Sequence, residues 1–420
     1  MKRTLGVLAV GMALIGGVWL VVSRSQSNGH FAQPQTDPEP ALVHNSTQFA
    51  FNLLKELARP DYPASQRRPT TLQEPSPNVL FSPLSVQFVL ALFLNGAEGQ
   101  TREEIAHALG VQATSLEVVN QFHSELRKAL EEQQGGNRLV LANSLWVRPF
   151  DQLHPEFGRI GRAFYALETY KVDFSKPLEA ARRINAWGKQ RTQGFVSEVV
   201  RPQEIAPDTI LGIANALYWR GLWQQPFKAA DYEMAFYPEG GKPVRVRPME
   251  AEWSQVPYGQ MEGCEIVGLP YQGGAWVCYV VLPRKGMRLL QLVEQLDAAR
   301  WEQYLGQMRV AERVKVVLPR FEGVREWNLI PALQRLGVQR AFKGQAEFPR
   351  IIQGDGGYIY LFKQVCRVRV DERGTEAGAV TAAMTRGLEL FVVDRPFLFV
   401  IQHRQTGAIL FMGVIRNPVV

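Results

Sequence analysis

The side chains that could act as nucleophiles, bases or metal ligands are scattered along the 420 residues of the chain. There is no GxSxG, HExxH or GK[ST] motif, and no dinucleotide fingerprint follows a strand-like run. The six histidines have none of the spacings that metal sites use; they are His30, His44, His107, His123, His154 and His403. A catalytic triad can assemble from distant positions, so a hydrolase is not excluded. The pattern favours a protein that is not an enzyme and that needs no metal or cofactor.

The three cysteines, Cys264, Cys278 and Cys366, form no CxxC motif and cannot all pair. Cys264 and Cys278 lie in two apolar runs on either side of a turn at 272–275. A hairpin of these runs would place Cys264 opposite a residue near Leu282, which is several positions beyond Cys278. Because a disulfide between them would be geometrically poor, we expect buried or free thiols.

One segment combines small side chains with strand-like neighbours on both sides. Residues 370–383 read VDERGTEAGAVTAA and contain almost nothing large. In an extended chain with a period of two, one face would carry Thr375, Ala377, Ala379, Thr381 and Ala383, and the other Glu376, Gly378, Val380 and Ala382. The first face has no charge, so it could enter a packed sheet without burying an ion. Gly374 would let the backbone turn where such an insertion begins.

The composition is that of a folded globular protein, with 46% apolar and 21% charged residues. The formal charge of +7 comes from 47 basic and 40 acidic residues. No run of lysines and arginines concentrates this charge, so we expect no nucleic-acid partner.

The N-terminus reads as a membrane-directed segment. Lys2 and Arg3 precede an uncharged stretch at 4–23, and Arg24 closes it. The stretch is long for a signal-peptide core and marginal for a membrane span, so residues 1–23 are either a signal peptide or a signal anchor. Both alternatives place the body of the protein outside the cytoplasm, secreted or anchored. Residues 24–42, with three prolines, are predicted to be a polar tether.

The elements that must position the small-residue segment belong to one domain, 43–420, with a proline-rich loop at 59–77. Asn45, Ser46 and Thr47 are typical of a helix start. Helical patterns dominate the first half, at 84–94, 103–109, 116–132, 155–164 and 178–193. Strand-like runs dominate the second, at 264–270, 275–282, 314–318, 397–401 and 408–415. This order predicts an α+β domain.

The small-residue segment resembles the reactive-loop hinge of inhibitory serpins. The hinge in this resemblance comprises Glu372, Arg373, Gly374, Thr375, Glu376, Ala377, Gly378, Ala379, Val380 and Thr381. Other serpin-like segments follow in the order of that family, at 78–85, 95–101, 143–146, 172–174, 184–187, 215–223, 394–399 and 406–413. Together they cover most of the chain, whereas one short motif alone would be weak.

The resemblance implies a serpin fold of three β-sheets and about nine α-helices, with an exposed reactive-centre loop between 370 and 394. It also implies a suicide-substrate inhibitor of serine proteases, and by the same chemistry of cysteine proteases. The protease attacks the loop and forms a covalent acyl-enzyme, and the cut loop then enters the main sheet as an extra strand. We expect a monomer that acts without a cofactor.

The resemblance further identifies a polar cluster beneath the opening strands, which we call the shutter. Asn78, Ser82, Pro83, Ser85 and Asn215 match it. The usual shutter histidine aligns with Gln364. Glutamine can donate and accept hydrogen bonds, but it cannot act as a proton switch.

The bond that a protease would cut is ambiguous from sequence. Counting forward from the hinge places it at Leu388–Glu389, and counting back from 395–397 places it at Met384–Thr385. Arg386–Gly387 lies between them and would suit a trypsin-like protease with an acidic pocket. All three bonds remain candidates.

The main alternative is a serpin-fold protein that binds or chaperones a partner without inhibiting a protease. Such proteins usually carry bulky, charged or proline residues in the hinge. The hinge here is small and uncharged on its inserting face, which favours inhibition.

Overall fold

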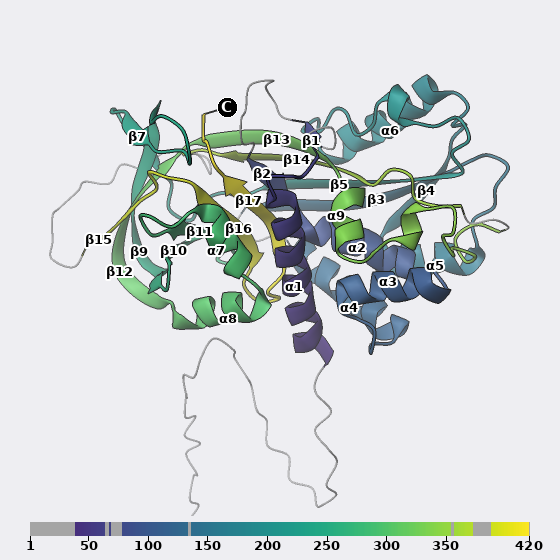
Figure 1. The fold of residues 1–420 in the computed structure, drawn as a ribbon, viewed down its shortest axis with the longest axis horizontal. Helices are drawn as coiled ribbons and strands as arrows, with labels where there is room; N and C mark the ends of the chain where they lie inside the picture. The colour runs from purple at the N-terminus through teal and green to yellow at the C-terminus, as the bar shows by residue number, and fades with distance from the viewer. Residues whose placement is uncertain are drawn as a thin grey trace, which may run out of the picture.

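The computed structural model describes residues 38–63, 67–68, 78–132, 136–353, 357–372 and 388–419. Many of the helices gather at one end of the molecule, and a large curved sheet with further helices beside it occupies the other (Figure 1). The α+β prediction is confirmed.

Nine α-helices form within these ranges; they are α1 (Pro38–Ala58), α2 (Pro83–Leu94), α3 (Gly99–Leu109), α4 (Leu116–Glu131), α5 (Pro155–Tyr165), α6 (Pro177–Arg191), α7 (Leu289–Gln295), α8 (Ala298–Gln307) and α9 (Ile330–Arg335). Two short 3₁₀ turns follow, η2 (Pro202–Glu204) and η3 (Arg340–Phe342). Every residue of α2 is buried, because its sequence is apolar on all sides and other elements surround it.

The first helix begins earlier than the sequence predicts. α1 starts at Pro38, so the tether prediction for 24–42 is wrong over its last residues. Asn45 and Ser46 lie inside the helix and do not cap it. The Asn45 amide donates to the Gly110 carbonyl at 2.7 Å, and the Ser46 hydroxyl donates to the Gln87 side chain at 2.8 Å. Their polar atoms serve tertiary contacts, which local sequence cannot reveal.

Two three-stranded sheets lie next to each other at the helical end. One has the order β4-β3-β5 and the other β1-β13-β14. Their strands are β1 (Arg67–Arg68), β3 (Arg138–Val147), β4 (Leu167–Lys171), β5 (Leu211–Arg220), β13 (Phe321–Asn328) and β14 (Lys363–Val370). α6 covers one face of β3 and β5 through a cluster that includes Ala142, Ala214 and Trp187, while α2 belongs to the main core on the other face.

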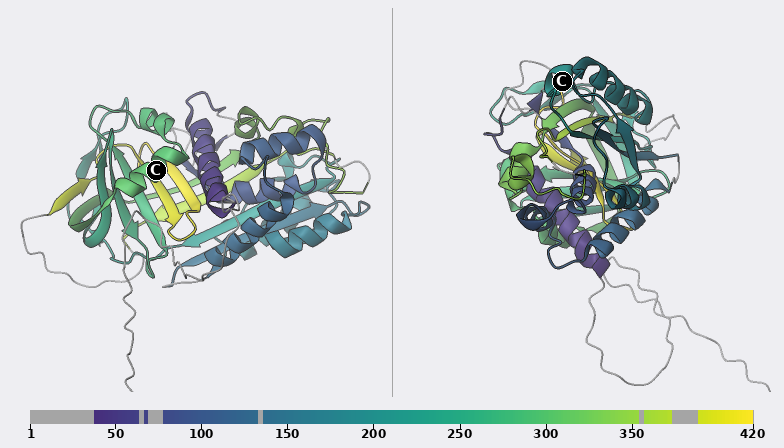
Figure 2. Two further views of the ribbon diagram at one scale, coloured as in Figure 1. Left: turned by 90° about the horizontal axis from the view of Figure 1, so that it is seen from below. Right: turned by 90° about the vertical axis from the view of Figure 1, so that its right-hand side faces the viewer.

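The large sheet has the order β15-β12-β9-β10-β11-β16-β17-β2, and β6 pairs with β9 beside this path. Its strands are β2 (Val79–Phe81), β6 (Lys228–Ala229), β9 (Pro248–Met261), β10 (Cys264–Pro270), β11 (Trp276–Pro283), β12 (Arg309–Pro319), β15 (Glu389–Val392), β16 (Phe397–His403) and β17 (Ile409–Ile415). β7 (Met234–Phe236) and β8 (Val244–Val246) form a separate ribbon. Figure 2 shows the curvature of the large sheet from two further sides.

The predicted hairpin of β10 and β11 is confirmed. Cys264 lies opposite Pro283, one residue from the predicted neighbour Leu282, and Cys278 lies opposite Leu269. Cys264, Cys278 and Cys366 are free and buried, and burial raises the pKa of each thiol to about 12. These thiols are therefore packing groups and not reactive ones.

Candidate functional site

β5 and β14 are the facing edges of the two three-stranded sheets (Figure 1). β5 pairs with β3 and β14 pairs with β13, and no ladder joins β5 to β14 in the described ranges. We call the space between them the gap. Edge strands present backbone N–H and C=O groups to whatever lies beside them, so the gap is a template for one more strand.

Two cavities show how the strands border the gap. The first, with an empty volume of about 770 Å³ including its open mouth, is lined by Gly212 near the start of β5 and by Lys363 at the start of β14. The second, of about 1110 Å³ on the same measure, is lined by Arg220 and Val370 at the ends of these strands. The two edges therefore run in the same direction, and a strand between them could be antiparallel to both.

The N-terminus of α2 is hydrogen-bonded to both edges of the gap. From β14, the Gln364 side chain donates to the Ser82 carbonyl at 2.9 Å and accepts from the Ser82 amide at 3.0 Å. From β5, Asn215 is hydrogen-bonded to the Ser85 hydroxyl. Ser82 also caps the helix by accepting from the Ser85 amide, and Pro83 is the first helical residue. Five of the six predicted shutter residues therefore come together.

Asn78 lies elsewhere. Its side chain donates to the Asn417 carbonyl at 2.7 Å and accepts from the Arg416 amide at 2.8 Å, which fixes the C-terminal segment. Its own carbonyl accepts from the buried Arg325 side chain at 2.8 Å. Asn78, directly before β2, joins the start of that strand to the C-terminal segment, and the sequence does not show this because the partners are more than 300 positions away.

Asn143 is a further member of the polar cluster, which the sequence places in the family-like segment 143–146 but not among the predicted shutter residues. It is buried in β3, accepts from the Asn215 amide at 2.7 Å and donates to the Tyr165 carbonyl at 3.1 Å. The Tyr165 hydroxyl continues the chain to Asn120 at 2.7 Å. The signal for Asn143 is an amide in the middle of a largely apolar strand, where a buried polar group needs partners.

The strand that leads into the hinge is held at its end. The Trp223 indole donates to the Asp371 carbonyl at 3.0 Å, and Glu372 pairs with Arg320 at 3.1 Å. The predicted hinge residues 373–381, and with them Met384, Thr385, Arg386 and Gly387, lie outside the described residues. The described chain leaves β14 at the same end of the gap at which β5 finishes.

The chain re-enters the described structure at Leu388, directly before β15. Glu389 pairs with Val314 in a parallel ladder with β12, and its carboxylate is paired with Arg309. Phe391 is fully buried. The predicted loop boundary at Asp394 is therefore wrong, because residues 389–392 are an edge strand of the large sheet.

A charge cluster crosses the outer side of the gap at its other end. Lys363 of β14 is paired with Glu204 at 2.9 Å and with Glu326 of β13 at 3.2 Å. Arg201 bonds the same Glu326 and belongs, with Glu204, to the connector from α6 to β5. Burial acts to raise the pKa of Glu204, but the hydrogen bonds and positive charges of Lys363 and Arg201 together outweigh it and leave that pKa below its usual value. We call these four side chains the clasp.

Within the described ranges, no three histidine, cysteine or acidic side chains converge as metal ligands would. In the same ranges no helix has the length and apolarity that a membrane crossing requires. The predicted N-terminal signal or anchor, 1–23, lies outside these ranges.

Comparisons with known proteins agree on one family. The model of the family described as Serpin (serine protease inhibitor) matches residues 44–418. An uncharacterised serpin-like protein of Thermococcus kodakarensis is 32% identical, over 90% of this chain and 86% of its own length. Human neuroserpin is 27% identical over 97% of each chain. The crystal structure of the thermophilic serpin tengpin in its native state superposes with a TM-score of 0.78 at 24% identity, covering 93% of this chain and 96% of tengpin.

Proposed function

The chain belongs to the serpin family, and on that premise we propose that it is a suicide-substrate inhibitor of serine proteases, and by the same chemistry of cysteine proteases. The observation that carries the proposal is the gap. No ladder joins its two edges, β5 and β14, and the shutter residues of α2 are hydrogen-bonded to both of them. The described chain ends beside this gap at Glu372, two residues after β14, and the predicted hinge continues from there in the sequence. In this proposal the protein traps an enzyme and is not one.

The reaction begins as an ordinary proteolysis. The protease serine or cysteine attacks the carbonyl of the scissile residue, the peptide bond breaks, and an ester or thioester to the protease forms. The leaving amine takes a proton from the catalytic histidine of the protease and becomes a new N-terminus. The atoms balance without a cofactor, so the loop and the sheet suffice.

Strand insertion would supply the driving force. The edges of the gap are 10 and 8 residues long. At about 1 kcal/mol net per hydrogen bond, two new ladders would contribute on the order of 10 kcal/mol. About 15 inserted residues at roughly 3.3 Å each would carry an attached protease some 50 Å. Hydrolysis of the ester must compete with this movement.

The scissile bond that we propose is Arg386–Gly387. A protease needs an extended substrate on both sides of the bond, and Glu389 is already paired in β15. This supports a bond upstream of Leu388–Glu389, and it leaves Met384–Thr385 as the competing site. Arg386 would direct the protein toward trypsin-like proteases with an acidic pocket.

The body of the protein would act outside the cytoplasm, where secreted proteases are the targets. This part of the proposal rests on the charges and length of segment 1–23 in the sequence.

The decisive test is complex formation with trypsin-, chymotrypsin-, elastase- and subtilisin-like enzymes. We expect an SDS-resistant band with at least one of them, and mass spectrometry of the released peptide should give a new N-terminus between 385 and 389. The matched control is Thr375→Arg, which puts a charge on the inserting face. Burying an unpaired charge costs several kcal/mol, so this variant should be cleaved without being trapped. Cleavage of the native protein without any trapped complex would contradict the proposal.

A further inference from the structure

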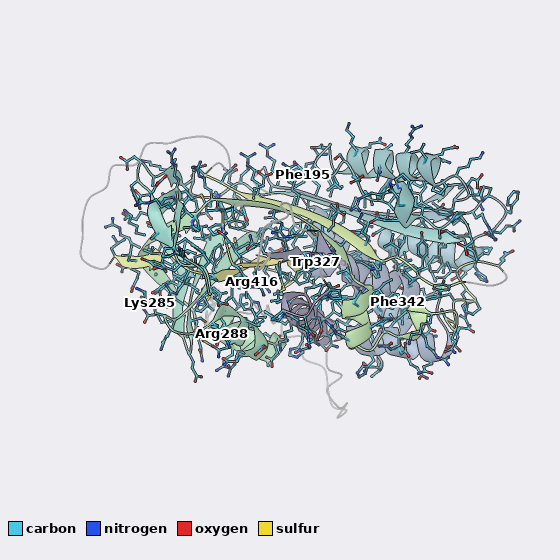
Figure 3. All side chains as sticks on the ribbon, turned by 45° about the horizontal axis from the view of Figure 1, so that its top comes forward. Phe195, Lys285, Arg288, Trp327, Phe342 and Arg416 are labelled. Atoms are coloured by element: carbon cyan, nitrogen blue, oxygen red, sulfur yellow. The ribbon has the colours of Figure 1, made fainter. Side chains whose placement is uncertain are left out.

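A series of hydrogen bonds between polar residues connects one end of α2 to the other. Asn95, which ends α2, and Asn120 of α4 donate to each other's side-chain oxygens at 2.9 and 2.8 Å. The Tyr165 hydroxyl, at the end of α5, donates to the same oxygen of Asn120 at 2.7 Å. Figure 3 shows side chains filling this end of the molecule, around Phe342, so the series runs through packed interior.

The series continues through the two long strands and returns to α2. The Asn143 side chain of β3 donates to the Tyr165 carbonyl at 3.1 Å and accepts from the Asn215 side chain of β5 at 2.7 Å. Asn215 is hydrogen-bonded to Ser85, in the first turn of α2. We call these six residues the polar ring; they are Ser85, Asn95, Asn120, Asn143, Tyr165 and Asn215.

Burial makes each bond of the polar ring hard to replace. Asn215 is half-buried and the other five residues are buried. When one partner of a buried hydrogen bond is removed, the other loses a contact that water cannot restore. Burial also raises the pKa of Tyr165 well above its usual range, so its hydroxyl keeps its proton and remains a donor. The position of each member therefore depends on that of its neighbours.

The corner between α5 and β4 is strained where the polar ring passes through it. Ala166 has a φ of 49°, a left-handed conformation that residues other than glycine rarely adopt. Its amide donates to the Gly161 carbonyl, and a Cβ at Gly161 would lie only 2.6 Å from the Leu167 side chain. Such strain persists only where the surroundings fix the backbone. The corner directs the Tyr165 carbonyl, one of the last carbonyls of α5, at the Asn143 amide.

Tyr165 is in contact with three elements besides its own helix. Its ring meets Phe88 of α2 edge-on at 6.3 Å between centres and lies tilted against His123 of α4 at 5.7 Å. Its carbonyl accepts from Asn143 of β3. The edge strand β5 is thus connected, through Asn215 and Asn143, to a residue that α2 and α4 hold in place.

We propose that Tyr165 is a positioning residue of the gap. Its hydroxyl, bound to Asn120 of α4, fixes the end of α5, and its carbonyl fixes Asn143 and with it the β5 edge. The inference rests on the proposed function and assigns a restraint to its central step, the widening of the gap. When β5 moves away from β14, α4 and α5 must move with it or a bond of the polar ring must break. The ring therefore resists widening in the native chain.

The first test measures the β5 edge directly and needs no inhibition. Tyr165→Phe removes one of the two donors to the Asn120 oxygen and touches no residue that borders the gap. We expect amide hydrogen exchange in residues 211–220 to become about fivefold faster. The matched control is Tyr304→Phe, which loses the hydrogen bond from α8 to the Glu262 carbonyl at 3.1 Å and should leave this exchange unchanged. Equal exchange rates at 211–220 in the two variants would overturn the inference.

The second test separates positioning from ordinary packing. Both tyrosine variants lose one hydrogen bond, so both should lower the midpoint of urea unfolding. Only Tyr165→Phe should also convert to a non-inhibitory form on warming about fivefold faster than the native protein. If both variants convert faster in proportion to their loss of stability, Tyr165 has a structural role alone and the inference fails.

A double variant tests whether Tyr165 acts through Asn143. Asn143→Ala removes the next link toward β5 and should itself speed exchange at 211–220. If both residues act along one path, Tyr165→Phe combined with Asn143→Ala should exchange no faster than Asn143→Ala alone. Effects that multiply would contradict the inference. If Asn143→Ala does not fold, the comparison of the two tyrosine variants still decides.

The positioning role and the proposed function can fail separately. A native chain that traps no protease, together with faster exchange in Tyr165→Phe, would refute the proposed function alone. Trapping by the native chain, together with equal exchange in the two tyrosine variants, would refute the positioning role alone.

Discussion

The Gln364 amide illustrates what a single side chain contributes at the shutter. It donates to the carbonyl of Ser82 and accepts from the amide of the same residue, so it needs both a donor and an acceptor. An amide offers both at any pH, whereas a protonated imidazole can only donate. We therefore infer that the two hydrogen bonds between Gln364 of β14 and Ser82 at the start of α2 do not change with pH.

A buried histidine elsewhere should make stability depend on pH. His123 of α4 is buried, packs edge-on against Phe88 at 5.1 Å between ring centres, and shares a hydrogen bond with the Val119 carbonyl. Burial lowers the pKa of His123 from 6.5 to about 4.

The folded state thus resists protonation of His123 while the unfolded chain accepts it. Stability should be fully present above pH 6.5 and should fall by about 2 kcal/mol as the pH drops to 5. His123→Phe keeps the ring and should reduce this loss, as urea unfolding at pH 7 and pH 5 would show. Burial also lowers the pKa of His403 to about 4. His403 is present in both proteins, so its contribution to the loss of stability cancels in the comparison. Equal losses in the two proteins would contradict this prediction.

The class of protease that the protein inhibits should also depend on one residue, Arg386. Arg386→Ala should slow complex formation with trypsin by about two orders of magnitude, because an arginine–carboxylate pair in a desolvated pocket contributes about 3 kcal/mol. Leu388→Ala and Met384→Ala are the matched controls and should leave the rate with trypsin unchanged. A strong loss in one control and none in Arg386→Ala would reassign the scissile bond. The rate constant for association is the measurement.

At the scale of elements, the clasp decides how firmly the connector before β5 is held to the other half of the sheet. Lys363 is almost completely buried and binds two carboxylates, one from the connector and one from β13. A strand that enters the gap must pass beneath this connection. The clasp should therefore slow insertion of an uncut loop.

Lys363→Met removes the shared cation while keeping the length of the side chain. We expect the native protein to convert to a non-inhibitory form on warming about tenfold faster, since breaking a partly buried ion pair costs a few kcal/mol and leaves Glu204 and Glu326 in repulsion. Residual inhibition after incubation is the measurement. Lys315→Met, which breaks the more exposed pair with Glu250 in the large sheet, should not change the rate. An unchanged rate for Lys363→Met would show that the clasp does not restrain insertion.

The sequence predicts long helices and strands with a clear periodicity better than short ones or those whose pattern is interrupted. The run at 264–270 coincides with β10, and the pattern at 116–132 ends one residue beyond α4. α9 has six residues and β15 four, too few for a periodicity to stand out. The sequence patterns also miss β3 and β5 as strands, because Asn143 and Asn215 interrupt their apolar runs and no clean alternation remains.

The candidate site follows the same rule. Family-like motifs locate Ser82, Ser85 and Asn215 from the sequence alone, and the hydrogen bonds bring these residues to one place. The motif does not separate Asn78, which bonds the chain terminus, from the others. Ion-pair partners that lie far apart in the sequence, such as Lys363 and Glu204 in the clasp, can be identified only from the fold.

At the scale of the whole molecule, the two three-stranded sheets have their edges facing across the gap, and the described strands form no ladder between them. If the proposed mechanism holds, the open pair of edges leaves hydrogen bonds to be gained, and the native chain would be less stable than a form with a strand in the gap. In that mechanism, cutting the loop would free the strand that completes the sheet. The same atoms should then form a more stable protein after losing one peptide bond.

Cleavage in the loop should therefore raise the midpoint of thermal unfolding. A gain on the order of 10 kcal/mol in a chain of this size corresponds to a shift of about 10–20 °C. The measurement is calorimetry of native protein and of protein nicked between 384 and 389, with both fragments retained. Thr375→Arg, nicked in the same way, should show little of the shift, because its inserting face carries a charge that the core cannot accept. An equal shift in this variant would mean that cleavage stabilises the molecule without strand insertion, and the trapping mechanism would lose its driving force.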